Sequence, residues 1–96
     1  MKINITAIIK SKPEAIEITK ALLTEIAIHS KQETACLQYD LHQSQETPEY
    51  FFFHEIWDNA EDLELHNAKP YILKFAEQAP SLLAETPKIY QTTKIA

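Results

Sequence analysis

Three side chains with useful chemistry, Glu55, Trp57 and His66, follow one another closely in the sequence. The stretch that holds them, YFFFHEIW followed by DNAEDLELH, is typical of an apolar strand that leads into a helix. A carboxylate or imidazole is costly to bury in such an aromatic run, so these residues are candidates for a functional site. Imidazole titrates near neutral pH, which makes His66 the natural general base. Glu55 is the alternative base or a group that orients the substrate, and the adjacent His54 is an equal candidate until its strand face is known.

The elements that must position these residues can be read from hydrophobic periodicity. We expect strands over residues 2–10, 34–43, 50–57 and 88–95, and helices over 13–31, 58–66 and 67–79, with one more turn possible over 81–85. This order, β-α-β-β-α-β, predicts a ferredoxin-like α+β fold with a four-stranded antiparallel sheet. The chain of 96 residues is long enough for a single domain, residues 1–96.

Helix starts are predicted from capping patterns. Ser11 and Glu14 have capping-box spacing with Pro13 in the first turn, but Lys12 as the cap with Pro13 at the first helical position is an alternative. The motif DNAE at residues 58–61 predicts a second capping box, with Asp58 as the cap. Pro80 is expected to end the last helix.

Strand register decides which residues face the helices. Pairing residue 42 with residue 50 gathers the large apolar groups on one face and moves His54 to the other. The helix-facing set is then Leu37, Tyr39, Leu41, Phe51, Phe53, Glu55 and Trp57. The opposite face carries Tyr50, Phe52 and Ile56, which are too apolar for open water. Two helices cover only one face of such a sheet, so we expect a homodimer packed sheet on sheet.

Composition excludes several classes of protein. The net charge is −5 and Arg is absent, which argues against nucleic acid or an anionic membrane as a partner. Gly is also absent, which excludes glycine-rich dinucleotide and phosphate loops. The single cysteine, Cys36, cannot form an intramolecular disulfide, and no signal peptide or membrane span is evident, so a cytoplasmic location is predicted.

A metal site is not predicted. Asp40, His42 and His54 loosely suggest a set of two histidines and a carboxylate on one sheet face. No HxH or HExxH spacing supports that set.

The run from Thr34 to Tyr90 resembles the antibiotic biosynthesis monooxygenase family. The matching positions are Cys36, Leu37, Tyr39, Glu55, Trp57, His66 and Pro70. The resemblance implies a dimeric α+β barrel and cofactor-independent oxygenation of quinols or related polycyclic phenols. Haem-degrading relatives use an Asn and a His where this chain has Thr6 and either Phe75 or Ala76, which disfavours haem. Antibiotic-pathway members have an Asn and an Arg where this chain has Phe53 and Glu77, so their proton-handling scheme does not carry over whole.

The predicted site is therefore a pocket on the helix-facing side of the sheet, with no metal and no cofactor. His66 and Glu55 are the catalytic candidates, and the substrate-binding candidates are Tyr39, Trp57, Phe53, Leu63 and Phe75. Tyr39 would donate to an oxyanion and Trp57 would stack on a flat ring. For each of these residues the structural alternative is an ordinary place in the core.

Two alternative functions stay open. The same fold could be a non-catalytic module that binds small molecules or serves in a stress response. An isomerase of a small keto or sugar compound would need cationic groups for phosphate, and only Lys69 and Lys74 lie near the relevant helix.

Overall fold

Alternating apolar residues build four strands, and their order along the chain is the predicted one. In the computed structural model, which describes residues 1–96, the strands are β1 (Ile3–Lys10), β2 (Cys36–Gln43), β3 (Tyr50–Trp57) and β4 (Lys88–Thr92). They form one antiparallel sheet in the order β2-β3-β1-β4. The ferredoxin-like α+β fold is thereby confirmed.

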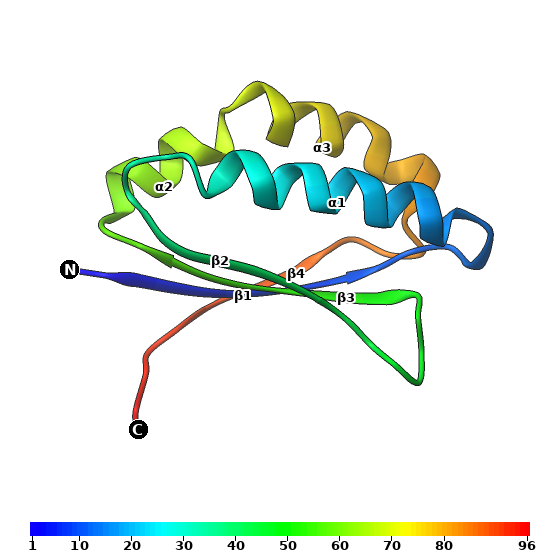
Figure 1. The fold of residues 1–96 in the computed structure, drawn as a ribbon, viewed down its shortest axis with the longest axis horizontal. Coiled ribbons are helices and arrows are strands. Elements are labelled where there is room, and N and C mark those ends of the chain that lie inside the picture. Colours follow the sequence, from blue (N-terminus) through cyan, green and yellow to red (C-terminus); the bar gives the residue numbers. More distant parts are fainter.

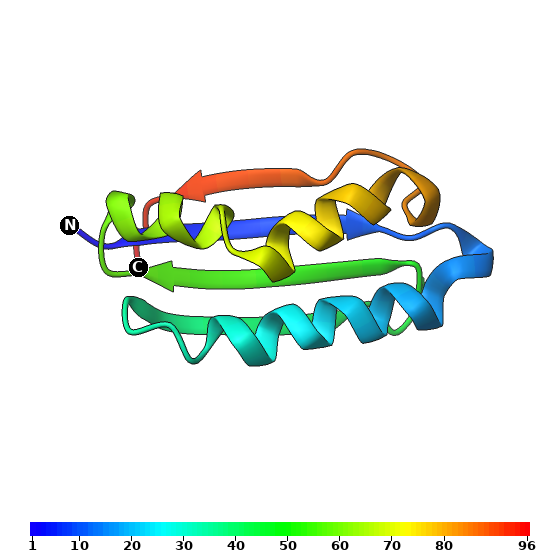
Figure 2. The ribbon, with the colours of Figure 1, turned by 90° about the horizontal axis from the view of Figure 1, so that it is seen from above.

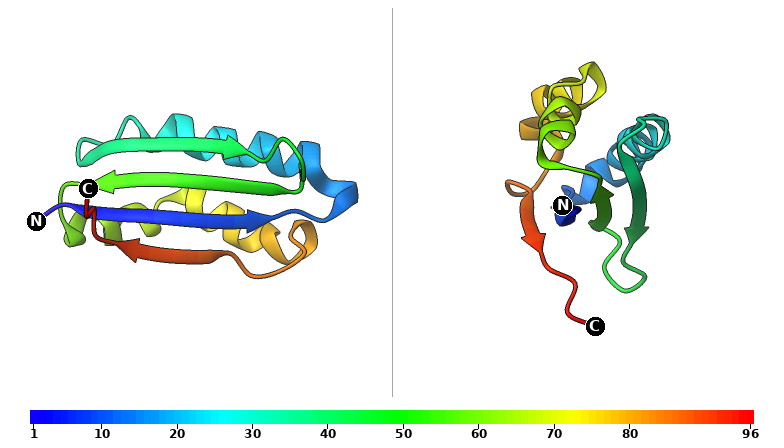
Figure 3. Two further views of the ribbon diagram at one scale, coloured as in Figure 1. Left: turned by 90° about the horizontal axis from the view of Figure 1, so that it is seen from below. Right: turned by 90° about the vertical axis from the view of Figure 1, so that its left-hand side faces the viewer.

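The helices form a single layer over this sheet (Figure 1). They are α1 (Ile16–Ser30), preceded by the 3₁₀ turn η1 (Pro13–Ala15), then α2 (Ala60–Asn67) and α3 (Pro70–Leu82). Seen from above, α1 runs over β2, whereas α2 and α3 run over β1 (Figure 2). No helix covers the other face of the sheet (Figure 3). None of the helices has the length and apolar character needed to cross a membrane.

The core lies between the helices and odd-numbered side chains of β1, β2 and β3. Nine of these strand residues are at most 8% exposed: Ile3, Ile5, Ala7, Ile9, Tyr39, Phe51, Phe53, Glu55 and Trp57. The helices contribute Leu23, Ile26 and Ala27 from α1. The predicted division of β3 into a helix-facing and an outer face is confirmed, because side chains alternate along a strand.

The β2–β3 register differs from the prediction by two residues. His42 pairs with Phe52 and not with Tyr50, because the loop is closed by the bond from the Ser44 amide to the Tyr50 carbonyl. A shift of two residues keeps every side chain on its predicted face. The exceptions lie where the register is irregular, between Cys36 and Gln38: Leu37 is 48% exposed, and Cys36, which the alternation of β2 would place on the outer face, packs against the core.

The observed helix ends differ from the first-choice predictions at three points: two helix starts and the end of the last helix. Lys12 is the cap before η1, with Pro13 following, as the alternative had it; the Ser11 hydroxyl instead donates to Thr19 Oγ1 at 3.1 Å. Asn59, and not Asp58, caps α2, because its side chain accepts from the Asp62 amide at 2.8 Å. Pro80 does not end α3, which continues to Leu82 and closes its last turn through the bond from the Leu83 amide to the Ala79 carbonyl.

The last strand is shorter than predicted and ends at Thr92. Its partner β1 pairs with it only from Asn4 to Ile8. No residue in the chain has a positive φ angle, so all turns are made without the left-handed conformation that favours glycine.

Candidate functional site

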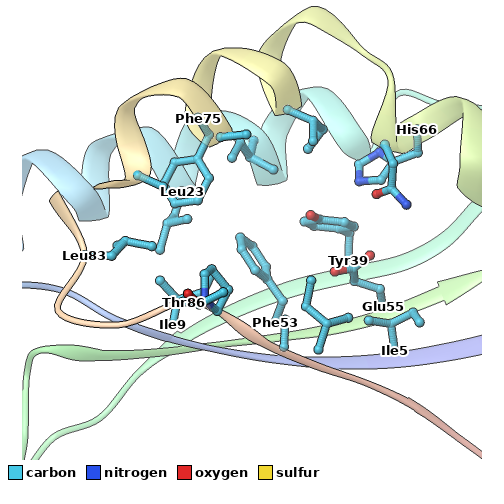
Figure 4. Close-up of a pocket in the computed structure, with 18 of the residues that line it drawn as sticks. Ile5, Ile9, Leu23, Tyr39, Phe53, Glu55, His66, Phe75, Leu83 and Thr86 are labelled. Carbon is cyan, nitrogen blue, oxygen red and sulfur yellow. The ribbon is translucent and has the colours of Figure 1, made fainter. Parts of the chain in front are cut away.

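A cavity of about 700 Å³ lies between the sheet and the layer of helices α1, α2 and α3 (Figure 4). Of its 21 lining residues 14 are hydrophobic, so it favours a largely apolar ligand. Phe75 and Leu83 close it on the helix side, and Ile5 and Phe53 lie on the sheet (Figure 4). Its polar lining groups are Tyr39, Glu55, His66, Asn67, Glu85 and Thr86, and it has no lysine.

His66 reaches the cavity from α2 and is 2% exposed. Its Nδ1 lies 2.7 Å from Oε2 of Glu33. A carboxylate only accepts hydrogen bonds, so Nδ1 carries the proton and Nε2 keeps a free lone pair. Burial lowers the pKa of His66 below its usual 6.5, although Glu33 opposes that shift. His66 is therefore neutral at pH 7 and able to accept a proton.

Glu55 reaches the same cavity from β3 and is 8% exposed. The indole Nε1 of Trp57 donates to its Oε1 at 2.9 Å. Burial raises the pKa of Glu55 to about 7, and the bond from Trp57 opposes this effect in part. A carboxyl group with this pKa both takes up and releases protons at neutral pH.

Tyr39 projects from β2 and is 3% exposed. Its ring centroid lies 5.0 Å from that of Phe53 and 5.6 Å from that of His66. Burial, reinforced by the nearby charge of Glu55, raises the pKa of Tyr39. The phenol therefore keeps its O–H and is a hydrogen-bond donor.

The predicted binding residues fall into two groups. Tyr39, Phe53, Leu63 and Phe75 line the cavity together with Glu55 and His66. Trp57 does not line it: the side chain is fully buried, with its ring centroid 4.3 Å from that of His66. Its place is behind Glu55 and His66, which it supports, so it is not positioned to stack on a ligand in this cavity.

Glu33 and Tyr71 were not predicted as site residues. Glu33 lies between α1 and β2, and its Oε2 accepts from both His66 and the hydroxyl of Tyr71. Tyr71, on α3, also stacks on His29 with ring centroids 5.1 Å apart. The sequence separates Glu33 from His66 by a whole hairpin, and a single acidic residue after a helix carries no local signal of such a partner.

His42 and His54, on the outer face of the sheet, lie near each other but do not form a metal site. The rings of His42 and His54 are 6.0 Å apart, and His54 Nδ1 lies 3.5 Å from Thr6 Oγ1. The Asp40 carboxylate accepts from Gln38 at 2.8 Å. No group of three or more His, Cys, Asp or Glu residues in the chain could hold a metal ion.

Comparison with known proteins gives the family. The antibiotic biosynthesis monooxygenase family model matches residues 3–78, which is most of the chain. The chain belongs to this family. The resemblance seen in the strand and helix motif is thus confirmed, and it extends to β1 and α1. No curated protein matches the sequence.

Solved structures of similar proteins cover nearly the whole chain. PA3566 from Pseudomonas aeruginosa is 30% identical, with a TM-score of 0.93 over 99% of this chain and 95% of that protein. A structure described as an antibiotic biosynthesis monooxygenase is 27% identical, with a TM-score of 0.90 and full coverage of both chains. Rv0793 from Mycobacterium tuberculosis is 21% identical and shares the fold, with a TM-score of 0.91 over 100% of this chain and 97% of that one.

Proposed function

We propose that this family member is a monooxygenase that oxygenates a small aromatic, quinol-like substrate without metal or flavin. The observation that carries the proposal is a neutral His66 with a free Nε2 at the wall of an apolar cavity. Tyr39 adds a hydroxyl donor and Glu55 adds a second group that exchanges protons near neutral pH. These are the groups that proton removal and stabilisation of an oxyanion require.

The reaction begins with loss of a phenolic proton. The O–H bond of the substrate breaks, the proton moves to Nε2 of His66, and the electron pair stays on the substrate. The electron-rich ring then reduces O₂ and is itself oxidised. With a reduced naphthoquinone, one oxygen atom enters the ring, the other leaves as water, and the product is a hydroxynaphthoquinone. Tyr39 would donate to the substrate oxyanion while this occurs.

The acidic groups in the cavity disfavour substrates that carry a negative charge. Glu55 and Glu85 line it and no lysine does, so a phosphate or carboxylate group would be repelled or left unpaired. This disfavours the isomerase of a phosphorylated sugar, since Lys69 lines a different hollow. A neutral fused-ring phenol fits both the apolar lining and the hydrogen-bonding groups.

Oxygen uptake with reduced naphthoquinones tests the proposal. We expect His66→Ala to lower the enzymatic rate by about 10²–10⁴-fold, the usual contribution of a general base. His54→Ala is the control for loss of a histidine, because His54 lies on the other sheet face and does not line the cavity; the rates are compared where both variants have the same sedimentation mass. Equal rates in wild type and His66→Ala would remove His66 as the base. Binding of the aromatic compounds without turnover would favour the non-catalytic binding module.

We also propose a homodimer that packs sheet on sheet. The outer face of β3 holds Tyr50, Phe52 and Ile56, which remain only half-buried in a single chain. Apolar groups gathered on one uncovered face favour association. Sedimentation at micromolar concentration should give twice the mass of one chain, and the mass of a single chain would refute the dimer. A cytoplasmic location stays a prediction that cell fractionation can check.

A further inference from the structure

Glu33 stands between two separate hollows of the molecule. His66 lines the apolar cavity, whereas Glu33 and Tyr71 do not. Glu33 and Tyr71 line a second hollow of about 550 Å³, and His66 does not. The bond between His66 Nδ1 and Glu33 Oε2 is therefore the link between the two.

The second hollow differs from the cavity in character. Only 3 of its 10 lining residues are hydrophobic. The side chain of Glu33 is 15% exposed and that of His66 is 3% exposed. The Glu33 carboxylate therefore faces a polar, partly solvent-exposed hollow on one side and the buried imidazole of His66 on the other.

We propose that Glu33, held by Tyr71, is a positioning residue that makes His66 a proton acceptor toward the cavity. This inference rests on the proposed function, since it concerns the same base. By accepting from Nδ1–H, the carboxylate leaves the lone pair on Nε2, which is the nitrogen that a ligand in the cavity can reach. When Nε2 accepts a proton, the negative charge of Glu33 stabilises the imidazolium, because the buried ring has little contact with water.

Tyr71 has a separate part in this arrangement. Its hydroxyl donates to the same Oε2 that accepts from His66. The two hydrogen bonds hold the Glu33 carboxylate in place, and each of the two donors, His66 and Tyr71, is stabilised by part of its negative charge. Removing the hydroxyl would therefore leave more of that charge to His66.

Other charged groups surround this pair. Lys69 lowers the pKa of His66, while Glu33 raises it. The second hollow also contains His29, Asp58 and Asp62, and the cavity side contains Glu55 and Tyr39. Only Glu33 makes a hydrogen bond to the His66 ring.

The first test measures the protonation state and pKa of His66 by nitrogen-15 NMR of its imidazole ring. Wild type should show a protonated Nδ1 and an unprotonated Nε2 at neutral pH. Glu33→Gln should lower the pKa of His66, because the charge that stabilises the imidazolium is lost. Tyr71→Phe should shift it the other way, to higher pH. Unchanged tautomer and pKa in Glu33→Gln would overturn the inference, whether or not the protein oxygenates quinols.

The second test is the pH profile of quinol oxygenation. Glu33→Gln should lower kcat about tenfold or more, as part of what a general base contributes, and leave KM nearly unchanged because Glu33 does not line the cavity. The acid limb of the profile should move to lower pH with the pKa of His66. A kcat and acid limb equal to wild type would overturn the role in catalysis.

Glu25→Gln is the matched control. Glu25 also faces a histidine, His29, at 3.8 Å, but both side chains are about half exposed. Loss of this exposed pair should change neither the His66 signals nor the rate. If wild type shows no oxygenation at all, the proposed function fails, while the NMR measurement still decides the role of Glu33.

Discussion

The two faces of the sheet carry similar residue types and yet do different things. Phe51, Phe53 and Glu55 point to the helices and are buried, whereas Phe52 and His54 point outward and are half-buried or exposed. The neighbours Glu55 and His54 differ most. Burial raises the pKa of Glu55 to about 7, whereas the one hydrogen-bond contact of the His54 side chain is a long one to Thr6. The comparison teaches that strand register, more than residue type, determines which titratable groups can serve a site.

The largest expected effect is loss of a helix-facing aromatic. Phe51 is fully buried, so Phe51→Ala should lower the free energy of unfolding by about 3–5 kcal/mol in urea denaturation. Phe52→Ala is the matched change on the outer face and should cost less. If the dimer forms, only the Phe52→Ala cost should depend on protein concentration. Equal costs for the two substitutions at every concentration would contradict the difference between the faces.

The next effect is the contribution of Glu55 to the dependence of stability on pH. The folded pKa of Glu55, about 7, lies above its usual 4.5, so the folded state binds the proton more tightly. Stability from this group is therefore fully present below about pH 4.5 and is lost as pH rises to about 7. The loss is on the order of 3 kcal/mol.

Glu55→Gln isolates this contribution, since the amide oxygen can still accept from Trp57. The difference in unfolding free energy between wild type and Glu55→Gln should change in favour of Glu55→Gln between pH 4.5 and 7. A difference that is constant with pH would mean that Glu55 is better solvated than its burial indicates.

The smallest effect is expected for His54. His54→Ala removes an exposed side chain whose one polar contact is 3.5 Å long, so the free energy of unfolding should change by about 0.5 kcal/mol or less. Thermal or urea denaturation at low protein concentration measures this change. A loss above 1 kcal/mol would show that the outer face contributes to the stability of the single chain.

The sequence predicted the element order and the face of each β3 side chain, because an alternation of two residues is unambiguous in that strand. It missed the register by two residues, since no glycine turn specified the loop between Ser44 and Tyr50. It also placed the helix cap one residue early, at Asp58, because Asp and Asn are equally good caps.

Sequence reasoning reached the residues whose face on their own strand or helix follows from periodicity, and it did not reach contacts that depend on how separate elements pack. His66, Glu55 and Tyr39 were selected as titratable groups on apolar faces, and all three line the cavity. Trp57 is near them but lies behind the cavity wall, which depends on packing depth and not on periodicity. Glu33 was missed because its contact with His66 depends on how a loop meets a helix in three dimensions.

Because no turn of this fold needs a positive φ angle, the chain can be built without glycine, and this lowers the conformational entropy of its unfolded state. Every residue carries a β-carbon, so the unfolded state has fewer backbone conformations to lose on folding. A chain of this length with ordinary glycine usage, about 7%, would hold roughly six or seven glycines. At about 0.4–1 kcal/mol for each compatible replacement, the difference amounts to roughly 3–7 kcal/mol. That is comparable to the whole net stability of a typical small domain.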